Sequence, residues 1–365
     1  MAWIVSAAAR AEAVNTNRDI ADTMSPKQIV ALIVLLVFVP LMTASLTCAS
    51  SSGKGGGSDD DLHDDDADDD GIDDDDNDND DDSDDDDDEF PACDQYGTPF
   101  SAGIINSGEL VEISGIAVSL KNPGVIWAHN DSGDGPVLYA VTTSGDFLGR
   151  VRLIGATAVD WEDMALGPCD GHECIHLGDI GDNDQNRDDA AVYRLIEPEL
   201  DPEIPFDDIQ TEDWERFPFA YPDGPRDAES LVVTPDGTVA VLTKQLGGTG
   251  VYCFPEMTPQ VPVTLLYFGD LPVSLPTGAD AHRNGRRLLV RTYINAREWR
   301  VEPGEPFWTI LGEHGTNVPA ASEPQGEAVA YDPFSGEYFH VSEGLFPDLF
   351  RVPCADAATD TPDTP

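Results

Sequence analysis

Residues 161–166 read WEDMAL, and similar six-residue segments recur between residues 113 and 331. The others are ISGIAV at 113–118, AESLVV at 228–233, ADAHRN at 279–284 and GEAVAY at 326–331. Aligning the five segments gives steps of 48, 67, 51 and 47 residues between Ser114, Glu162, Glu229, Asp280 and Glu327. Steps of this size are typical of one four-stranded propeller blade with its turns.

A second apolar strand follows each segment, and third and fourth strands follow in most repeats. The last repeat ends at residues 349–352 without a fourth strand, whereas an unassigned strand at 102–105 precedes the first repeat. We therefore predict an all-β domain over residues 90–355, a β-propeller of four-stranded blades whose N-terminal strand closes the ring and leaves no open strand edge. Five blades are counted, the 67-residue step has room for a sixth, and a β-sandwich is the alternative fold.

Residues 24–48 have the pattern of a signal peptide. Lys27 precedes an apolar run at 29–42, which is short for a membrane span but suits a signal core. The sequence ASLTC that ends at Cys48 resembles a lipobox, although its threonine and leucine depart from the usual pattern. We expect diacylation of Cys48 and a monomeric protein anchored by lipid at the cell envelope or surface; cleavage near Ala49 and secretion are the alternative.

The other terminal segments are predicted to lie outside the folded domain. Residues 1–23 carry mixed charge and precede Met24, so we interpret them as an extension upstream of the true start. Residues 49–89 contain a Gly/Ser stretch and then 23 acidic residues without a base. Such a segment has too few apolar groups to offset chain entropy, which predicts a disordered acidic stalk. Residues 356–365 are predicted to be a disordered tail.

The charge of the chain excludes one large class of partner. The formal net charge is -52, and about -30 remains from residue 90 onward. A surface this acidic repels phosphate backbones, so we expect no nucleic-acid partner. Metal cations are favoured instead.

The repeat places acidic residues where the inner strands of a propeller begin. Strands of successive blades converge on a central channel, so carboxylates at equivalent positions must protonate, pair or bind a cation. Calcium is the cation that carboxylates prefer outside the cell. The alternative is that these side chains cap strand ends and accept backbone hydrogen bonds. The predicted metal ligands are Glu162, Asp163, Glu229, Asp280 and Glu327.

The ends of the second strands supply further candidates. Lys244 and Arg291 each follow an apolar strand in a domain with few bases, and as catalytic residues they would hold a phosphate or carboxylate group beside the metal. Alternatively, each neutralises a neighbouring acid. Asp and Asn before Gly are also ordinary turn formers. The predicted substrate-binding residues are His129, Asp131, Asp182, Arg187 and Glu343.

Six cysteines in an exported chain favour disulfides. Cys169 and Cys174 flank a predicted hairpin tip and are close enough for a local bridge. Cys93 and Cys354 bracket the domain, where a bridge would clamp the ring. A zinc site that uses Cys169, His172 and Cys174 is the alternative for the first pair, although its spacing is not a standard one.

Two sequence patterns resemble known propeller families. NPGVIW at 122–127, followed by LYA at 138–140, resembles the blades of bacterial phytase-like propellers. The DxE openings at 160–162 and 227–229 resemble calcium-binding propellers of the lactonase and esterase-like type. The resemblance implies a calcium-dependent hydrolase of a phosphate ester or lactone. The alternative function is a non-catalytic surface lipoprotein that binds a ligand or protein and uses calcium structurally.

Overall fold

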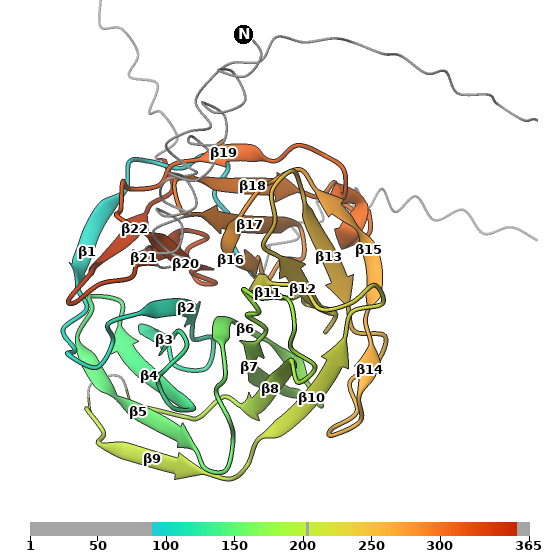
Figure 1. Cartoon of the computed structure of the whole chain (residues 1–365). Coiled ribbons are helices and arrows are strands. Elements are labelled where there is room, and N and C mark those ends of the chain that lie inside the picture. Colours follow the sequence, from blue (N-terminus) through green and yellow to red (C-terminus); the bar gives the residue numbers. More distant parts are fainter. Residues whose placement is uncertain (1–89, 202–203, 356–365) are drawn as a thin grey trace, which may run out of the picture. The chain divides into compact units, whose positions relative to one another are not determined.

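The computed structural model describes residues 90–201 and 204–355, which form five β-sheets arranged as a ring (Figure 1). The sheets are the blades of a propeller, so the predicted all-β propeller fold and the count of five blades are confirmed. The predicted signal segment with Cys48, the acidic stalk and the C-terminal tail lie outside the described residues. Within the described ranges, no helix has the length and apolar character needed to cross a membrane.

In blades 1 to 3, the strands follow one another along the chain from the innermost strand outward. Blade 1 contains β2 (Ile113–Val118), β3 (Val125–Asn130), β4 (Val137–Thr142) and β5 (Phe147–Leu153). Blade 2 contains β6 (Trp161–Cys169), β7 (His172–Asp179), β8 (Ala191–Ile196) and β10 (Glu215–Ala220). Blade 3 contains β11 (Ala228–Val233), β12 (Val239–Thr243), β13 (Thr249–Cys253) and β15 (Leu266–Leu271).

The last two blades follow the same plan. Blade 4 contains β16 (Pro276–Ala281), β17 (Arg287–Thr292), β18 (Ala296–Arg300) and β19 (Thr316–Val318), with the short 3-10 helix η1 (Phe307–Ile310) before β19. Blade 5 contains β20 (Gly326–Tyr331), β21 (Tyr338–Ser342), β22 (Asp348–Val352) and, from the other end of the domain, β1 (Phe100–Ile104).

The 67-residue step contains an additional edge strand rather than a sixth blade. Between β8 and β10, the chain forms β9 (Asp208–Thr211), which pairs in parallel with β5 of blade 1. The strand β14 (Val263–Thr264) likewise pairs in parallel with β10 of blade 2. Both strands return to the outer edge of the preceding blade, where they cover backbone groups that would otherwise be open to pairing.

The core lies between the blades. The inner strands β2, β11 and β20 are buried along their whole length, which explains why their sequences read as nearly continuous apolar runs rather than as alternating patterns. Five buried apolar clusters each join two neighbouring blades. Trp127 and Trp161 fill the cluster between blades 1 and 2, and both are almost fully buried.

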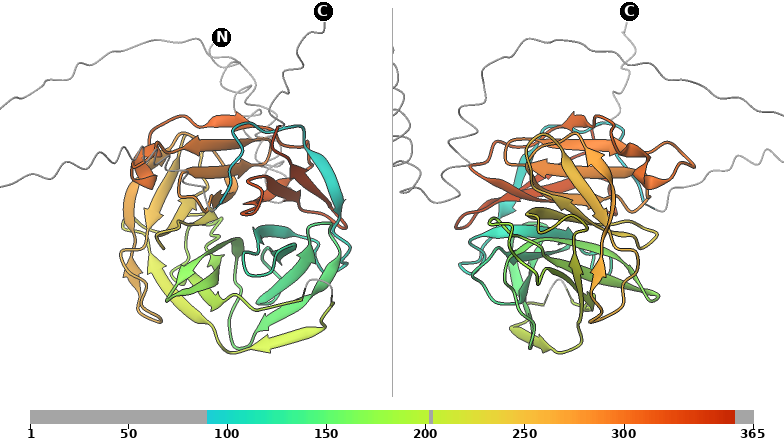
Figure 2. Two further views of the ribbon diagram at one scale, coloured as in Figure 1. Left: turned by 180° about the vertical axis from the view of Figure 1, so that it is seen from behind. Right: turned by 45° about the vertical axis from the view of Figure 1, so that its right-hand side comes forward.

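The N-terminal strand closes the ring, as the sequence predicts. β1 pairs antiparallel with β22, with Phe100 opposite Arg351 and Ile104 opposite Asp348. The observed strand begins two residues before the predicted segment at 102–105. Figure 2 shows β1, in cyan, beside the red strands of blade 5.

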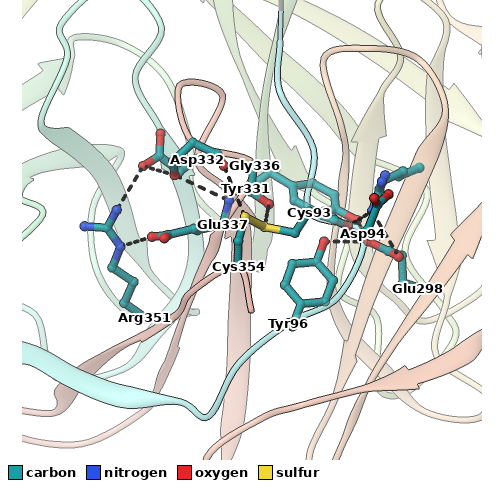
Figure 3. The surroundings of a disulfide bond; sticks show 12 residues. Cys93, Asp94, Tyr96, Glu298, Tyr331, Asp332, Gly336, Glu337, Arg351 and Cys354 are labelled. Atoms are coloured by element: carbon teal, nitrogen blue, oxygen red, sulfur yellow. Dashed lines mark hydrogen bonds and ion pairs between the residues drawn. A yellow bond between two sulfur atoms is a disulfide. The ribbon is translucent and has the colours of Figure 1, made fainter. Parts of the chain in front are cut away.

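Both predicted disulfides are present. Cys93 and Cys354 are 261 residues apart in sequence and their Cα atoms are 5.1 Å apart (Figure 3). Beside this bridge, the Tyr96 hydroxyl donates a 2.6 Å hydrogen bond to Glu298 of blade 4. The Cys169–Cys174 disulfide lies at the tip of the β6–β7 hairpin, and it rules out the alternative zinc site because bridged sulfurs are not thiolate ligands.

We expect the two disulfides to differ in their effect on stability. On the chain-entropy estimate, a bridge that closes a loop of the Cys93–Cys354 length contributes about 5.5 kcal/mol, and one as short as Cys169–Cys174 about 2 kcal/mol. Replacing both Cys93 and Cys354 by serine should therefore lower the urea midpoint much more than replacing Cys169 and Cys174. Equal losses in the two double variants, or free thiols at Cys93 and Cys354 in non-reducing peptide mapping, would contradict this account.

Candidate metal centre

Every inner strand carries a β-bulge directly after its first residue. In β6, the pairing with β7 shifts between Trp161 and Asp163, and matching shifts occur in the other four inner strands. A bulge leaves one residue without a ladder partner and changes the direction of its side chain. The bulged residues, which we call the bulge ring, are Ser114, Glu162, Glu229, Thr277 and Glu327. They lie where the inner strands begin, at the end of the channel that we call the mouth.

Asp280 does not belong to the bulge ring, so the sequence alignment of the fourth repeat is wrong by three residues. The bulge of β16 falls at Thr277, between Pro276 and Gly278. Asp280 lies toward the far end of β16, where its carboxylate accepts a 2.8 Å hydrogen bond from the amide of Tyr331. The sequence alignment matched Asp280 to the acids of the other repeats, whereas the position of the β-bulge determines which residue of β16 is equivalent to them.

The two hydroxyl residues of the bulge ring connect neighbouring blades. Ser114 Oγ donates to the backbone carbonyl of Glu162. Thr277 Oγ1 donates to the carbonyls of Gly326 and Glu327, at 3.0 Å each. These side chains therefore hold blade 1 to blade 2 and blade 4 to blade 5, and they leave three carboxylates in the ring.

Three acidic side chains meet at one side of the mouth. Asp131 directly follows β3, Asp160 directly precedes β6, and Glu162 is the bulged residue of β6. Each offers a carboxylate oxygen, and these oxygens lie within 4.8 Å of one another. Of the predicted metal ligands, this cluster contains Glu162; Asp131 was predicted to bind substrate. Asp160 was missed as a site residue, although the DxE pattern at 160–162 contains it.

The cluster depends on a glycine. A Cβ at Gly181 would lie 2.2 Å from Glu162 Oε1 and 2.5 Å from Asp160 Oδ2, so a side chain there would occupy the space of both carboxylates. Asp179 fixes the neighbouring loop by accepting a 3.0 Å hydrogen bond from the amide of Asp160. The two carboxylates and Gly181 therefore pack as one unit.

Burial and mutual repulsion make the acidic cluster unfavourable when it is charged. Burial, followed by the charge of Asp131, raises the pKa of Asp160 to about 6, although Arg187 opposes the shift. Burial, followed by the charges of Glu229 and Asp131, raises the pKa of Glu162 well above its usual range. A bound cation would offset both effects. Three carboxylates can supply three to six oxygen ligands, which suits calcium, although the arrangement does not select one hard cation over another.

Glu229 and Lys244 form an ion pair at the mouth. Burial raises the pKa of Glu229 to about 7, despite the opposing charge of Lys244. The Lys244 ammonium also lies 5.2 Å from the centre of the Tyr293 ring. Lys244 is therefore where the sequence predicts it, but it is paired with an acid of the bulge ring.

Glu327 is a buried carboxylate with one oxygen still available. Its Oε1 accepts a 2.8 Å hydrogen bond from the Gln325 side chain. Its Oε2 has no hydrogen-bond partner among the described residues. Burial, followed by the charge of Glu229, raises the pKa of Glu327 well above its usual range.

Asp163, a predicted metal ligand, binds the backbone of three blades. Its Oδ1 accepts from the amide of Met164, and its Oδ2 accepts from the amides of Leu231 at 2.9 Å and Ala279 at 3.1 Å. The side chain is fully buried. This arrangement matches the alternative in which aligned acids accept backbone hydrogen bonds.

Arg291 and His129 are buried away from solvent. Arg291 donates a 2.9 Å hydrogen bond to Glu323, and His340 Nδ1 lies 2.7 Å from the same carboxylate oxygen. His129 Nδ1 is 2.9 Å from the Asn130 carbonyl, and its ring packs edge-on against Trp161. The structure therefore places neither side chain in the acidic cluster, and their catalytic and substrate-binding roles stay predictions.

The remaining predicted substrate-binding residues lie in loops of the mouth. Asp182 accepts hydrogen bonds from the amides of Asn186 and Arg187, both at 2.9 Å. Arg187 donates to Asp179 at 2.7 Å. The Glu343 amide donates to the Gln325 carbonyl at 3.2 Å. Asp182 and Arg187 therefore stabilise their own loop, and a contact of either residue with a substrate stays a prediction.

Comparison with known proteins gives a likeness of fold. No family model matches the chain, and no curated protein matches it. A luciferin-regenerating enzyme matches at 10% identity and a TM-score of 0.43, over 70% of this chain and 95% of that one. The PQQ-bound aldose sugar dehydrogenase from Streptomyces coelicolor matches at 11% identity and a TM-score of 0.40, over 72% of this chain and 99% of that one. A putative gluconolactonase matches at 12% identity and a TM-score of 0.36, over 72% of this chain and 93% of that one. These values assign no activity to this chain.

Replacing Gly181 by alanine should weaken cation binding at least tenfold, because the new Cβ would displace the carboxylates of Asp160 and Glu162. The shift of the melting temperature with added calcium measures this effect in the full chain. Gly108→Ala is the matched control, since an added Cβ there meets no atom within 4 Å. An unchanged calcium response in Gly181→Ala would argue against this cluster as the binding site.

Asp280 should destabilise the domain as the pH rises. Burial raises the pKa of Asp280 to about 7, whereas an unfolded aspartate titrates near 4. Between these values the folded state holds a proton that the unfolded chain has released, so the free energy of unfolding falls as the pH rises. Asp280→Asn should remove this slope, at most about 1.4 kcal/mol per pH unit. Urea unfolding from about pH 4 to pH 7.5 measures it, and parallel curves for both proteins would refute the assignment.

Proposed function

We propose that the domain is a calcium-dependent hydrolase of neutral esters or lactones, with its metal held by Asp131, Asp160 and Glu162. The observation that carries this proposal is the meeting of three carboxylates, from two chain segments, within 4.8 Å of one another. Their burial and mutual repulsion favour a bound cation. The predicted export of the chain is in keeping with the two disulfides, which persist in oxidising surroundings.

A bound divalent cation would supply a Lewis acid for a carbonyl oxygen and lower the pKa of a coordinated water. Among the chain's own groups, Glu327 has a free buried oxygen and a raised pKa, which suit a general base. The Lys244 ammonium is placed to stabilise negative charge that develops on a substrate oxygen, provided that its pairing with Glu229 loosens.

The charge of the mouth favours a neutral substrate over a phosphate ester. Lys244 and Arg291 were predicted to hold a phosphate or carboxylate group together, but Arg291 is buried in its pairing with Glu323. Lys244 alone faces several carboxylates, including Glu162 and Glu229. A doubly charged phosphate would meet more negative than positive charge, whereas an ester or lactone carries no such penalty.

The alternative function is a non-catalytic surface propeller with a structural cation. The Glu229–Lys244 ion pair favours this alternative, because both groups satisfy each other without a substrate. The two functions share the metal site and differ only in hydrolysis. They are therefore separated by an activity assay on protein with calcium bound.

Calcium should raise the melting temperature of the full chain, and Glu162→Gln should abolish most of that rise. At one hundred times the dissociation constant, ligand linkage contributes about 2.7 kcal/mol, which corresponds to roughly 5–10 °C for a domain of this size. The acidic stretch is common to both proteins, so its own calcium binding cancels. Asp280→Asn is the matched control, because it removes a buried carboxylate outside the cluster.

Hydrolysis of a 4-nitrophenyl ester or a simple lactone should require calcium and fall at least a hundredfold in Glu162→Gln. If the wild-type protein is stabilised by calcium but hydrolyses neither substrate, the structural-cation alternative stands. If calcium changes neither stability nor activity, the metal proposal fails altogether.

A further inference from the structure

Large apolar side chains are exposed on three successive loops of the mouth. Leu246 is 67% exposed, Ile294 is 65% exposed and Leu345 is 64% exposed. Each lies in the loop between the second and third strands of its blade, in blades 3, 4 and 5 respectively. Single exposed apolar residues are common, but several on one rim indicate a binding surface.

The register of the blades places these loops at the mouth. The loops begin where β12, β17 and β21 end, and the last residues of these strands pair with the first residues of the inner strands. Thr243 pairs with Ala228, for example. The Lys244–Tyr293 contact joins the first two loops, and Gly344 donates a 3.1 Å hydrogen bond to the carbonyl of Val111.

The loop of blade 5 presents its apolar side chains at a conformational cost. Phe346 has a φ of 54°, in the left-handed region that bulky residues rarely adopt, and it is 46% exposed. Such a conformation costs on the order of 1–3 kcal/mol and persists where the surroundings impose it. The following Pro347 carbonyl accepts a 2.9 Å hydrogen bond from Ile105, which fixes the loop to the ring closure. The exposed pair Leu345 and Phe346 is thus held outward rather than folded away.

The other half of the mouth is mainly polar, and its large exposed apolar side chain is Val159, which is 47% exposed directly before Asp160. The corresponding loops of blades 1 and 2 contain Asp131, Asp134 and Asp182, with no large apolar residue at their tips. The acidic cluster lies on this side, because Asp131 and Glu162 belong to blades 1 and 2. The mouth therefore has a polar half with the candidate metal centre and an apolar half, which we call the apolar rim. Its residues are Val111, Leu246, Ile294, Leu345 and Phe346.

We propose that the apolar rim binds the hydrocarbon chain of an amphipathic ester or lactone whose polar end lies at the metal centre. This inference rests on the proposed function and narrows its substrate class to long-chain acyl compounds. A lipid bilayer fits less well, because the rim occupies only part of the mouth and the domain carries about -30 charges, which anionic head groups repel. A single chain needs only a narrow apolar strip beside a polar site.

The dependence of hydrolysis on acyl-chain length tests this proposal. We would compare 4-nitrophenyl acetate with 4-nitrophenyl decanoate in the wild-type chain and in the double variant Leu345→Ser, Phe346→Gly. Glycine suits the backbone at position 346, so the variant should fold. The matched control is Ile196→Ser, since Ile196 is 52% exposed at the end of β8 that lies away from the mouth. The ratio of kcat/KM for decanoate to that for acetate should fall roughly tenfold in the rim variant, equivalent to about 1.4 kcal/mol, and stay unchanged in the control. Equal losses for both esters would overturn the proposal.

A direct binding assay distinguishes failure of the apolar-rim proposal from failure of the hydrolase proposal. If the wild-type chain hydrolyses neither ester, the proposed function fails, and fluorescence anisotropy with a decanoyl amide of a fluorophore then tests the rim alone. Weaker binding in the rim variant than in Ile196→Ser supports the rim as a hydrocarbon site, and equal binding overturns it.

Flotation with phosphatidylcholine vesicles tests a lipid membrane as the other occupant. It is done in a Cys48→Ser background so that no lipid anchor contributes. Vesicle binding that needs the rim, without any chain-length preference, would assign the rim to a membrane and overturn the proposal.

Discussion

The pairing of β1 with β22 is the contact on which the geometry of the mouth depends. Without it, blade 5 would have three strands and an open edge, and only side-chain packing between blades 1 and 5 would close the ring. The Cys93–Cys354 bridge reinforces the closure. So does Glu298, which is buried and accepts hydrogen bonds from Tyr96, Tyr331 and Arg300, and thereby connects the N-terminal segment with blades 4 and 5 (Figure 3). A buried carboxylate with that many donors is well compensated.

Ring closure brings many acids into a small volume, and their hydrogen-bond partners distinguish what they do. Asp163 and Asp280 accept hydrogen bonds from backbone amides of neighbouring blades, so these carboxyl groups connect the blades. Asp160 and Glu162 instead lie next to other carboxylates beside Gly181, so charge repulsion adds to the cost of burying their charge. The same residue type at neighbouring positions thus has two physical roles. Only the second creates a demand for a cation.

The few basic residues near the inner strands also differ in what surrounds them. Lys244 reaches the mouth and pairs with Glu229, whereas Arg291 is enclosed between blades 4 and 5 with Glu323 and His340. Bases are scarce in the sequence of the domain, but scarcity does not tell whether a side chain near the end of a strand points into the mouth or between two blades. The exposed side chains on the other half of the mouth add a feature that charge alone would miss. A polar and an apolar half next to each other suit a substrate with the same division.

The sequence by itself indicated the repeat with its five units, the closing strand and the Cys93–Cys354 bridge, because each follows from local apolar runs, their spacing or the position of cysteines at the ends of the domain. The structure excluded a sixth blade in the 67-residue step and showed the Cys169–Cys174 bridge in place of a zinc site. It also placed Glu162, Glu229 and Glu327 correctly in their repeats. Only the tertiary structure decided that Thr277 and not Asp280 completes the bulge ring, since a bulge is a property of strand pairing. The structure also decided that Asp131, Asp160 and Glu162 form the cluster. Their proximity depends on the angle between blades 1 and 2 and on the absence of a side chain at Gly181, and neither is encoded in the residues' own spacing.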